Sequence, residues 1–171
     1  MQVKSVAAII LHVSLLAGGS FAQKVSIDYD HDADFAGYRT YAWAPSQNPA
    51  KSPLWNQRII DNIDRQLAAK GLQPADAEAD LLVTYNGGLQ EDVSLRGFGT
   101  GGRWARGSIS VNKVTKLEGT LIVDLYDQAA KRLVWRGIAT ETVSDQTEKN
   151  IAKLEKVVEI LFKDYAPEPK Q

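Results

Sequence analysis

The chain has 171 residues, and its 20 Lys and Arg against 21 Asp and Glu give a formal net charge of −1, which leaves no general attraction to nucleic acid. Cysteine is absent, which excludes disulfides, thiol nucleophiles and thiolate metal sites. An apolar content of 44% and a charged content of 24% are ordinary globular values, and the length suits one domain plus processing segments.

Residues 1–22 have the organisation of a secretory signal peptide. Lys4 gives a positive start, an apolar run extends over Val6–Ala17, and the small residues Ser20 and Ala22 predict cleavage after Ala22. The apolar run is shorter than the ~20 residues that span a bilayer, so we expect no transmembrane segment. Gly19 stands where a lipoprotein would carry its lipidated cysteine. We therefore expect no lipid anchor and a soluble periplasmic or secreted protein.

Two short strands are predicted at the start of the mature chain. Gln23–Asp30 alternates apolar and polar positions, and Arg39–Trp43 is rich in strand-forming residues and is stopped by Pro45. Four aspartates occupy alternate positions in this region, and an extended strand would place them all on one face: Asp28, Asp30, Asp32 and Asp34.

The aspartate run raises the question of a calcium site, because calcium prefers several carboxylate oxygens. A calcium loop with this spacing needs glycine at its sixth position and glutamate at its twelfth. Counting from Asp28, those positions hold Ala33 and Arg39, so the match fails. We favour a solvated strand edge, with Asp34 capping a turn that leads to Gly37. We predict no metal site and no cofactor.

A first amphipathic helix is predicted after a proline-containing connector. Ser52 is the expected N-cap, Pro53 the first helical residue, and Gly71 the C-terminal glycine, with Leu72 placed to pack back on the helix. Its apolar stripe recurs every four residues: Trp55, Ile59, Ile63 and Leu67.

A buried strand is predicted over Ala79–Tyr85, where a continuous apolar run is broken by Asn86-Gly87-Gly88. The following segment, residues 86–107, carries seven of the 13 glycines and forms either an irregular hairpin or a mobile loop. Gly97–Gly102 fits the pattern G-x-G-x-x-G, but dinucleotide binding needs a helix directly after it. A loop and a strand are predicted there instead, so we regard the match as accidental.

Three further strands and a closing helix are predicted downstream. Ser108–Thr115 alternates weakly, whereas Gly119–Tyr126 and Leu133–Ala139 form a clear β-hairpin. The helix covers Ser144–Phe162, with capping-box spacing at Asp145 and Glu148, and residues 166–171 form a loose tail. The order of elements predicts an α+β fold, in which two amphipathic helices pack on one face of a mostly antiparallel sheet and bury Trp55 and Trp135.

Two stretches carry a resemblance to a known family. The sequence DYDHDADFAGYRTYAW at Asp28–Trp43 and the apolar strand at Ala79–Tyr85 resemble the signature of the domain of unknown function 4136, a family of bacterial envelope and lipoprotein-like domains. The glycine-rich segment and the closing helix add to the resemblance, which covers Val25 to Tyr165. It implies a single envelope-associated α+β domain over residues 23–165, and it implies no reaction.

The candidate ligand-binding residues lie in the glycine-rich segment: Arg96, Arg103, Trp104 and Arg106. Guanidinium groups and a flat ring suit phosphates, carboxylates and sugar faces, and exposed loops often carry function. The alternative is an ordinary exposed loop, in which the arginines pair with Glu91 and Asp92.

No catalytic residue is predicted. No serine lies in a G-x-S-x-G motif, and His31 has no recognisable partner spacing. We expect a non-catalytic domain that binds an unknown envelope protein or polymer, or that has a structural role. The rival function is a carboxylate-dependent hydrolase acting on envelope polymer, because such carboxylate pairs need proximity in space alone. Its nominal candidates are Glu118, Asp124 and Glu141.

Overall fold

The computed structural model describes residues 24–76, 78–100 and 108–166, and for 92–100 and 108–114 it describes the backbone. These residues form two helices and a six-stranded mixed, mostly antiparallel sheet, which confirms the predicted α+β fold. The elements are β1 (Lys24–Tyr29), β2 (Thr40–Trp43), α1 (Pro53–Ala69), β3 (Gln73–Pro74), β4 (Leu81–Thr100), β5 (Ser108–Asp127), β6 (Arg132–Val143) and α2 (Thr147–Phe162). The predicted leader at 1–22 and the tail beyond residue 166 lie outside the described residues.

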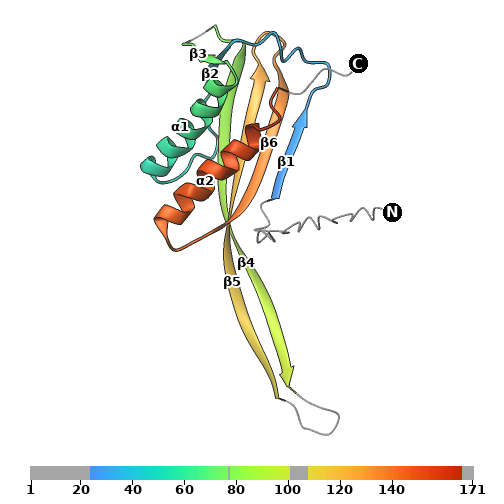
Figure 1. Ribbon diagram of the computed structural model, residues 1–171, viewed down its shortest axis with the longest axis vertical. Coiled ribbons are helices and arrows are strands. Elements are labelled where there is room, and N and C mark those ends of the chain that lie inside the picture. Colours follow the sequence, from blue (N-terminus) through green and yellow to red (C-terminus); the bar gives the residue numbers. More distant parts are fainter. Residues whose placement is uncertain (1–23, 77, 101–107, 167–171) are drawn as a thin grey trace, which may run out of the picture.

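The strands lie in the order β1-β6-β5-β4-β2-β3. In the series β1-β6-β5-β4 each strand runs antiparallel to its neighbours. By contrast, β2 runs parallel to both β3 and β4. A parallel pair needs a crossover connection, and α1 supplies it between β2 and β4. Both helices lie on the same side of the sheet (Figure 1).

The hydrophobic core lies between the helices and the odd-numbered positions of the central strands. Successive side chains of a strand point to opposite faces, so one residue in two reaches the helices. On β4 and β5 these are Leu81, Val83, Tyr85, Leu121, Val123 and Leu125, all buried. Trp135 is buried as predicted, but Trp55 is partly exposed and lies outside the core, beside the guanidinium of Arg58.

The C-terminus of α1 has the predicted glycine cap. Gly71 adopts a φ of +85°, a conformation that costs a side-chain-bearing residue more than glycine. The N–H groups of Gly71 and Leu72 donate to the carbonyl oxygens of Ala68 and Leu67, each at 3.0 Å. Leu72 is buried beside Leu67, which completes a Schellman motif.

The N-terminus of α1 is confirmed, with Ser52 as the N-cap and Pro53 as the first helical residue, although the Ser52 side chain makes no capping hydrogen bond. The predicted capping box of α2 is wrong, because the N-cap is Gln146. Ser144 and Asn150 bond each other instead: Asn150 Oδ1 accepts from the Ser144 N–H at 2.8 Å, and Asn150 Nδ2 donates to the Ser144 carbonyl at 2.7 Å.

The prediction that four aspartates share one face of an extended strand is also wrong. β1 ends at Tyr29, and the chain then turns. Asp30 Oδ1 accepts from the Asp32 N–H at 2.9 Å, and the Asp34 carbonyl accepts from the Gly37 N–H at 3.0 Å, which is the expected turn. Aspartate favours such local turns because its side chain bonds to nearby backbone N–H groups.

The predicted break at Asn86-Gly87-Gly88 does not occur, because β4 continues through it to Thr100. The Gly87 N–H donates to the Asn48 carbonyl at 2.9 Å on one side, and β5 pairs with the glycines on the other. Residues 86–100 are therefore strand, which agrees with the hairpin alternative. The two strands predicted at 108–115 and 119–126 are the single strand β5.

Candidate functional site

The outer halves of β4 and β5 form a two-stranded arm, defined here as residues 89–100 and 108–119. Its register runs from Leu89 opposite Gly119 to Thr100 opposite Ser108. β6 pairs with β5 only as far as Leu117, so most of the arm lies beyond the other strands. Figure 1 shows it projecting away from the helices and the rest of the sheet, which we call the body.

Of the four predicted ligand-binding residues, Arg96 belongs to this arm. Arg96 lies on β4, where its backbone is in register with Asn112. Arg103, Trp104 and Arg106 lie outside the described residues. The described backbone ends at the pair Thr100 and Ser108, at the end of the arm farthest from the helices (Figure 1).

A shallow depression of about 270 Å³ lies at the opposite end of the molecule. The loop after β1, the residue before β4 and the turn between β5 and β6 meet there. Its lining residues are Ala33, Asp34, Gly37, Tyr38, Asp80, Asp127, Ala129 and Arg132.

Two of the carboxylates in this depression are held by hydrogen bonds. Asp127 accepts from the Ala130 N–H at 2.8 Å and from the Tyr38 hydroxyl at 2.9 Å. Asp80 Oδ2 accepts from the N–H groups of Arg39 and Thr40 at 2.8 and 2.9 Å, and from the Thr40 hydroxyl at 3.0 Å.

These bonds favour the charged carboxylates. The Ala130 N–H is the main cause that lowers the pKa of Asp127, and the Arg39 N–H is the main cause that lowers the pKa of Asp80. Burial, and then the bond to Asp127, raises the pKa of the Tyr38 hydroxyl and keeps it protonated. A carboxylate with a lowered pKa is a poor general acid at neutral pH. The network therefore fastens β2, β4 and the β5–β6 turn together.

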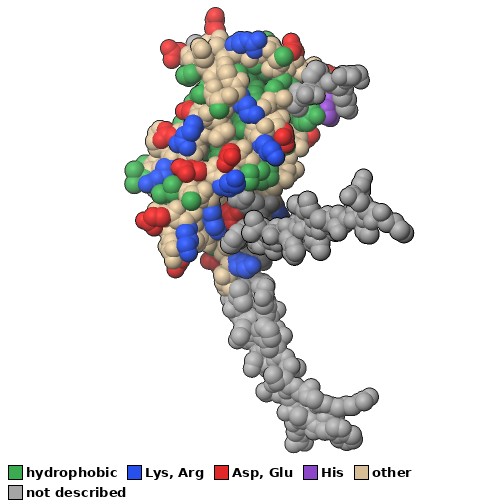
Figure 2. Space-filling view, in the orientation of Figure 1, with side chains coloured by type: hydrophobic (Ala, Val, Ile, Leu, Met, Phe, Trp, Pro, Cys, Tyr) green, Lys and Arg blue, Asp and Glu red, His purple; other side chains and the backbone are tan. Residues whose placement is uncertain are grey.

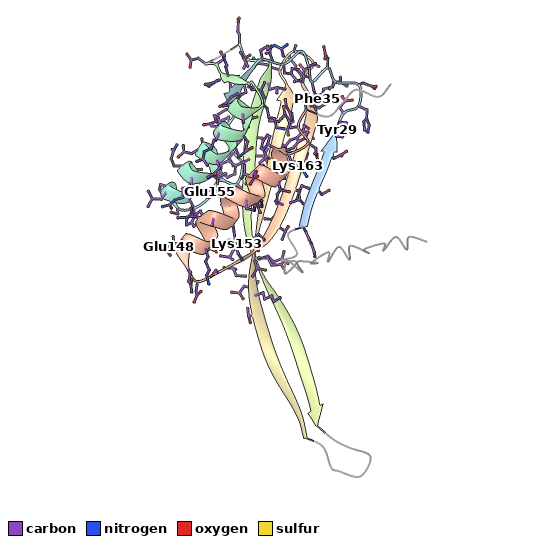
Figure 3. All side chains as sticks on the ribbon, in the orientation of Figure 1. Tyr29, Phe35, Glu148, Lys153, Glu155 and Lys163 are labelled. Carbon is purple, nitrogen blue, oxygen red and sulfur yellow. The ribbon has the colours of Figure 1, made fainter. Side chains whose placement is uncertain are left out.

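The aromatic residues of Asp28–Trp43 are also structural. Tyr41 Oη and Trp43 Nε1 both donate to Asp64 Oδ1 of α1, at 2.8 and 2.9 Å. Burial is the main cause that raises the pKa of Tyr41. Figure 3 shows Tyr29 and Phe35 at the same end of the molecule, where their ring centroids lie 6.1 Å apart. This stretch therefore ties the first strands to the helices.

The three nominal carboxylates for hydrolysis do not converge. Asp124 is 3% exposed and accepts from Arg136 Nε and Nη2 at 2.6 and 2.8 Å. Glu141 is opposite the odd-numbered Gly119 and pairs with Lys153 Nζ of α2 at 3.1 Å, so it lies on the helix side. Asp124 and Glu118 occupy even-numbered positions of β5, which face the other side of the sheet.

The face of the body that carries the helices shows no concentration of one charge (Figure 2). Figure 2 shows acidic and basic side chains interspersed over the face that carries the helices. Among the described residues, no three His, Asp or Glu side chains are grouped as a metal site would require. No helix within the described ranges is long and apolar enough to cross a membrane.

The fold and the arm define an α+β domain in which two helices pack against one side of a mostly antiparallel sheet. The chain belongs to the family described as domain of unknown function (DUF4136), whose model matches residues 25–167. No match was found among curated proteins.

Two solved structures were matched, the first of which shows a similar fold. A PDZ domain protein from Parabacteroides distasonis is 15% identical with a TM-score of 0.59, over 86% of this chain and 37% of that protein. The chain thus spans little more than a third of that relative's length. The PelC dodecamer from Paraburkholderia phytofirmans is 16% identical with a TM-score of 0.46, over 81% of this chain and 96% of that one.

Proposed function

We propose that this protein is an exported, non-catalytic domain of the bacterial envelope that binds an anionic envelope polymer through the outer end of the arm. The binding residues are those predicted from the sequence: Arg96, Arg103, Trp104 and Arg106. The observation that supports the proposal is the arm itself, whose paired strands carry Arg96 and extend to Thr100 and Ser108, away from the body (Figure 1).

Charge supports an anionic partner. The sequence from Leu95 to Val114 contains four basic residues and no acidic one, although the whole chain has a net charge of −1. A local excess of one sign attracts ligands of the opposite sign and increases their local concentration. Arginine also forms bidentate bonds with carboxylate and phosphate, and an aromatic ring packs on sugar faces.

The carboxylates favour binding over hydrolysis. Hydrolysis of a glycosidic bond needs two carboxyl groups on either side of one substrate position. Asp124 and Glu141 lie on opposite faces of the sheet, and each is engaged by a cation of its own. The proposed role is therefore binding by the arm, without a catalysed reaction.

Export is part of the proposal, and it rests on the leader at residues 1–22 and on the family to which the domain belongs. Cleavage after Ala22 would leave a mature chain that begins at Gln23, in the periplasm or outside the cell. N-terminal sequencing of the protein recovered from cell fractions identifies both the cleavage site and the compartment.

The test of binding is a calorimetric titration of the mature chain with alginate, used as a model anionic polysaccharide, and with neutral dextran. We expect saturable binding of alginate that weakens as salt is added, because salt screens exposed charges. Arg103→Ala and Trp104→Ala should each weaken binding about tenfold, the loss expected for one charge-assisted or stacking contact.

Arg65→Ala is the matched control, because Arg65 is an exposed arginine of α1 on the body. It should bind alginate like the wild type. Equal weakening by Arg65→Ala and Arg103→Ala would contradict a site at the end of the arm. Absence of binding to a panel of anionic polysaccharides would contradict the proposed ligand class, and a partner protein would then take its place.

A further inference from the structure

The register of the arm separates its positions into two faces. Each odd-numbered residue of β4 pairs with an odd-numbered residue of β5, and we call such a pair a row. By strand alternation these odd-numbered positions belong to the same face as the buried residues Leu81, Val83 and Val123. The aliphatic residues of the arm fall in this odd-numbered class, with Val114 as the exception. The members of the class are Leu89, Val93, Leu95, Ile109, Val111 and Leu117.

Within the described residues, neither helix reaches the arm (Figure 1). The helices pack over β6, β1 and each other in the body (Figure 1). Leu89, at the base of the arm, is 71% exposed. In general, an apolar face that no other element of the fold covers marks an interaction surface.

Two charged residues of opposite sign interrupt the face. Glu91 is in register with Leu117, and Lys113 is in register with Leu95. The two rows are four residues apart along the arm, which is about 13 Å at roughly 3.3 Å per residue. Midway between them is the row of Val93 and Thr115.

These charges decide which occupant fits. A bilayer would have to bury the carboxylate of Glu91 in hydrocarbon, and its anionic leaflet would repel it. A second copy of this chain avoids both costs. When two arms stack face to face and antiparallel about a two-fold axis at the Val93 row, each Glu91 row meets the partner's Lys113 row. The same surface patch then serves both copies, as a two-fold interface requires.

We propose that the odd-numbered face of the arm is a self-association surface, on which two copies of this chain stack their arms in antiparallel orientation. The parallel arrangement brings the two Glu91 rows together and is disfavoured by repulsion. An arm about 40 Å long and about 10 Å wide would bury roughly 800 Å² over both copies. That area is at the low end for a specific interface, so the dimer should be reversible, with a dissociation constant in the micromolar range.

The inference rests on the proposed function only in treating the arm as a contact surface. It concerns the apolar face and purified protein, whereas the proposed function concerns Arg103, Trp104 and a polymer. A monomeric chain that still binds alginate would reject the inference alone. A dimer that binds no polymer would reject the proposed ligand alone.

The test is sedimentation analysis of the mature chain over a concentration series up to about 100 µM, where a micromolar dimer is populated. We expect a monomer–dimer equilibrium. Glu91→Lys and Lys113→Glu should each raise the dissociation constant at least about tenfold, because each places like charges in facing rows. The double variant Glu91→Lys with Lys113→Glu should restore the wild-type constant.

An equimolar mixture of the two single variants gives the sharpest result. In the mixed dimer both facing rows regain opposite charges, so the mixture should dimerise although neither variant does so alone. Lys149→Glu, the same charge change at an exposed position of α2, should leave the constant unchanged. A monomeric wild type, or single variants that dimerise normally, would overturn the proposal. Failure of both the double variant and the mixture to dimerise would overturn it as well.

Discussion

Among the glycines whose surroundings the structure describes, Gly137 of β6 has the least room for a side chain. A Cβ atom there would lie 2.5 Å from Trp135 Cη2 and 2.8 Å from Leu161 Cδ2. The ring of Trp135 stacks on Phe162, with centroids 5.0 Å apart, so it has little freedom to move away. Glycine is therefore required where the sheet meets α2.

We predict that Gly137→Ala lowers the free energy of unfolding by about 1–3 kcal/mol, the usual cost of forcing an extra carbon into a packed core. Urea denaturation measures this change. Gly88→Ala is the control, because a Cβ at Gly88 meets no atom within 4 Å. Equal stability of the two variants would show that Trp135 and Leu161 yield without cost.

At the residue scale, the sequence predicted which side chains are buried better than it predicted which residues bond to each other. Trp135 was predicted from strand alternation and is buried, whereas Trp55, predicted from the same helical stripe as Ile63, is partly exposed. The bonds from Arg39 and Thr40 to Asp80 join residues about 40 positions apart. No local pattern specifies such a contact, because it depends on the parallel pairing of β2 with β4.

At the element scale, local residue preferences predict where a helix or strand ends only if no tertiary contact outweighs them. Gly71 ends α1 as predicted, because the left-handed turn favours glycine and the cap bonds are local. Gly87 and Gly88 were predicted to end β4, yet they are strand. Pairing with β5 and with Asn48 outweighs the weak strand preference of glycine.

The form of the candidate site could not be predicted from the sequence. The sequence indicated Arg96, Arg103, Trp104 and Arg106 from residue type alone, and their segment was assigned to a hairpin or a loop. A paired arm could not be derived, because long ladders depend on register between distant residues. One signal in the sequence was available. The aliphatic residues from Leu89 to Leu117 mostly occupy odd-numbered positions on both sides of the glycines, which is the alternation of paired strands.

We predict that the body folds without the arm. Replacing residues 90–118 by Asn-Gly would join Leu89 to Gly119 through a tight two-residue hairpin turn. Among the residues whose burial is described, the fully buried core side chains all lie outside this segment. The melting temperature should therefore change by less than about 5 °C. A larger fall in a thermal unfolding scan would place the arm within the cooperative core.

At the scale of the whole molecule, the class of fold could be predicted because the order of strands and helices restricts the ways to bury two amphipathic helices. The parallel pairing of β2 with β4 and the small strand β3 could not, since each contributes few residues to a pattern. The projecting arm makes the molecule longer than a compact domain of its size (Figure 1).

We predict that small-angle scattering of the mature chain, at a concentration below that of dimer formation, gives a radius of gyration above the ~15 Å of a compact domain of this length. The variant without residues 90–118 should approach the compact value. A full-length chain that already has the compact value would show that the arm folds back on the body in solution.

The strand period of two also limits how the arm can vary among descendants of this sequence. Removing one residue from β4 between Asn86 and Leu89, without a matching change in β5, would move every later position of that strand to the other face. Shortening both strands by two residues would preserve the faces and bring the basic end closer to the helices. Length changes in this hairpin are therefore expected to accumulate as even numbers of residues in both strands. The length of the arm can then change while each remaining residue keeps its face.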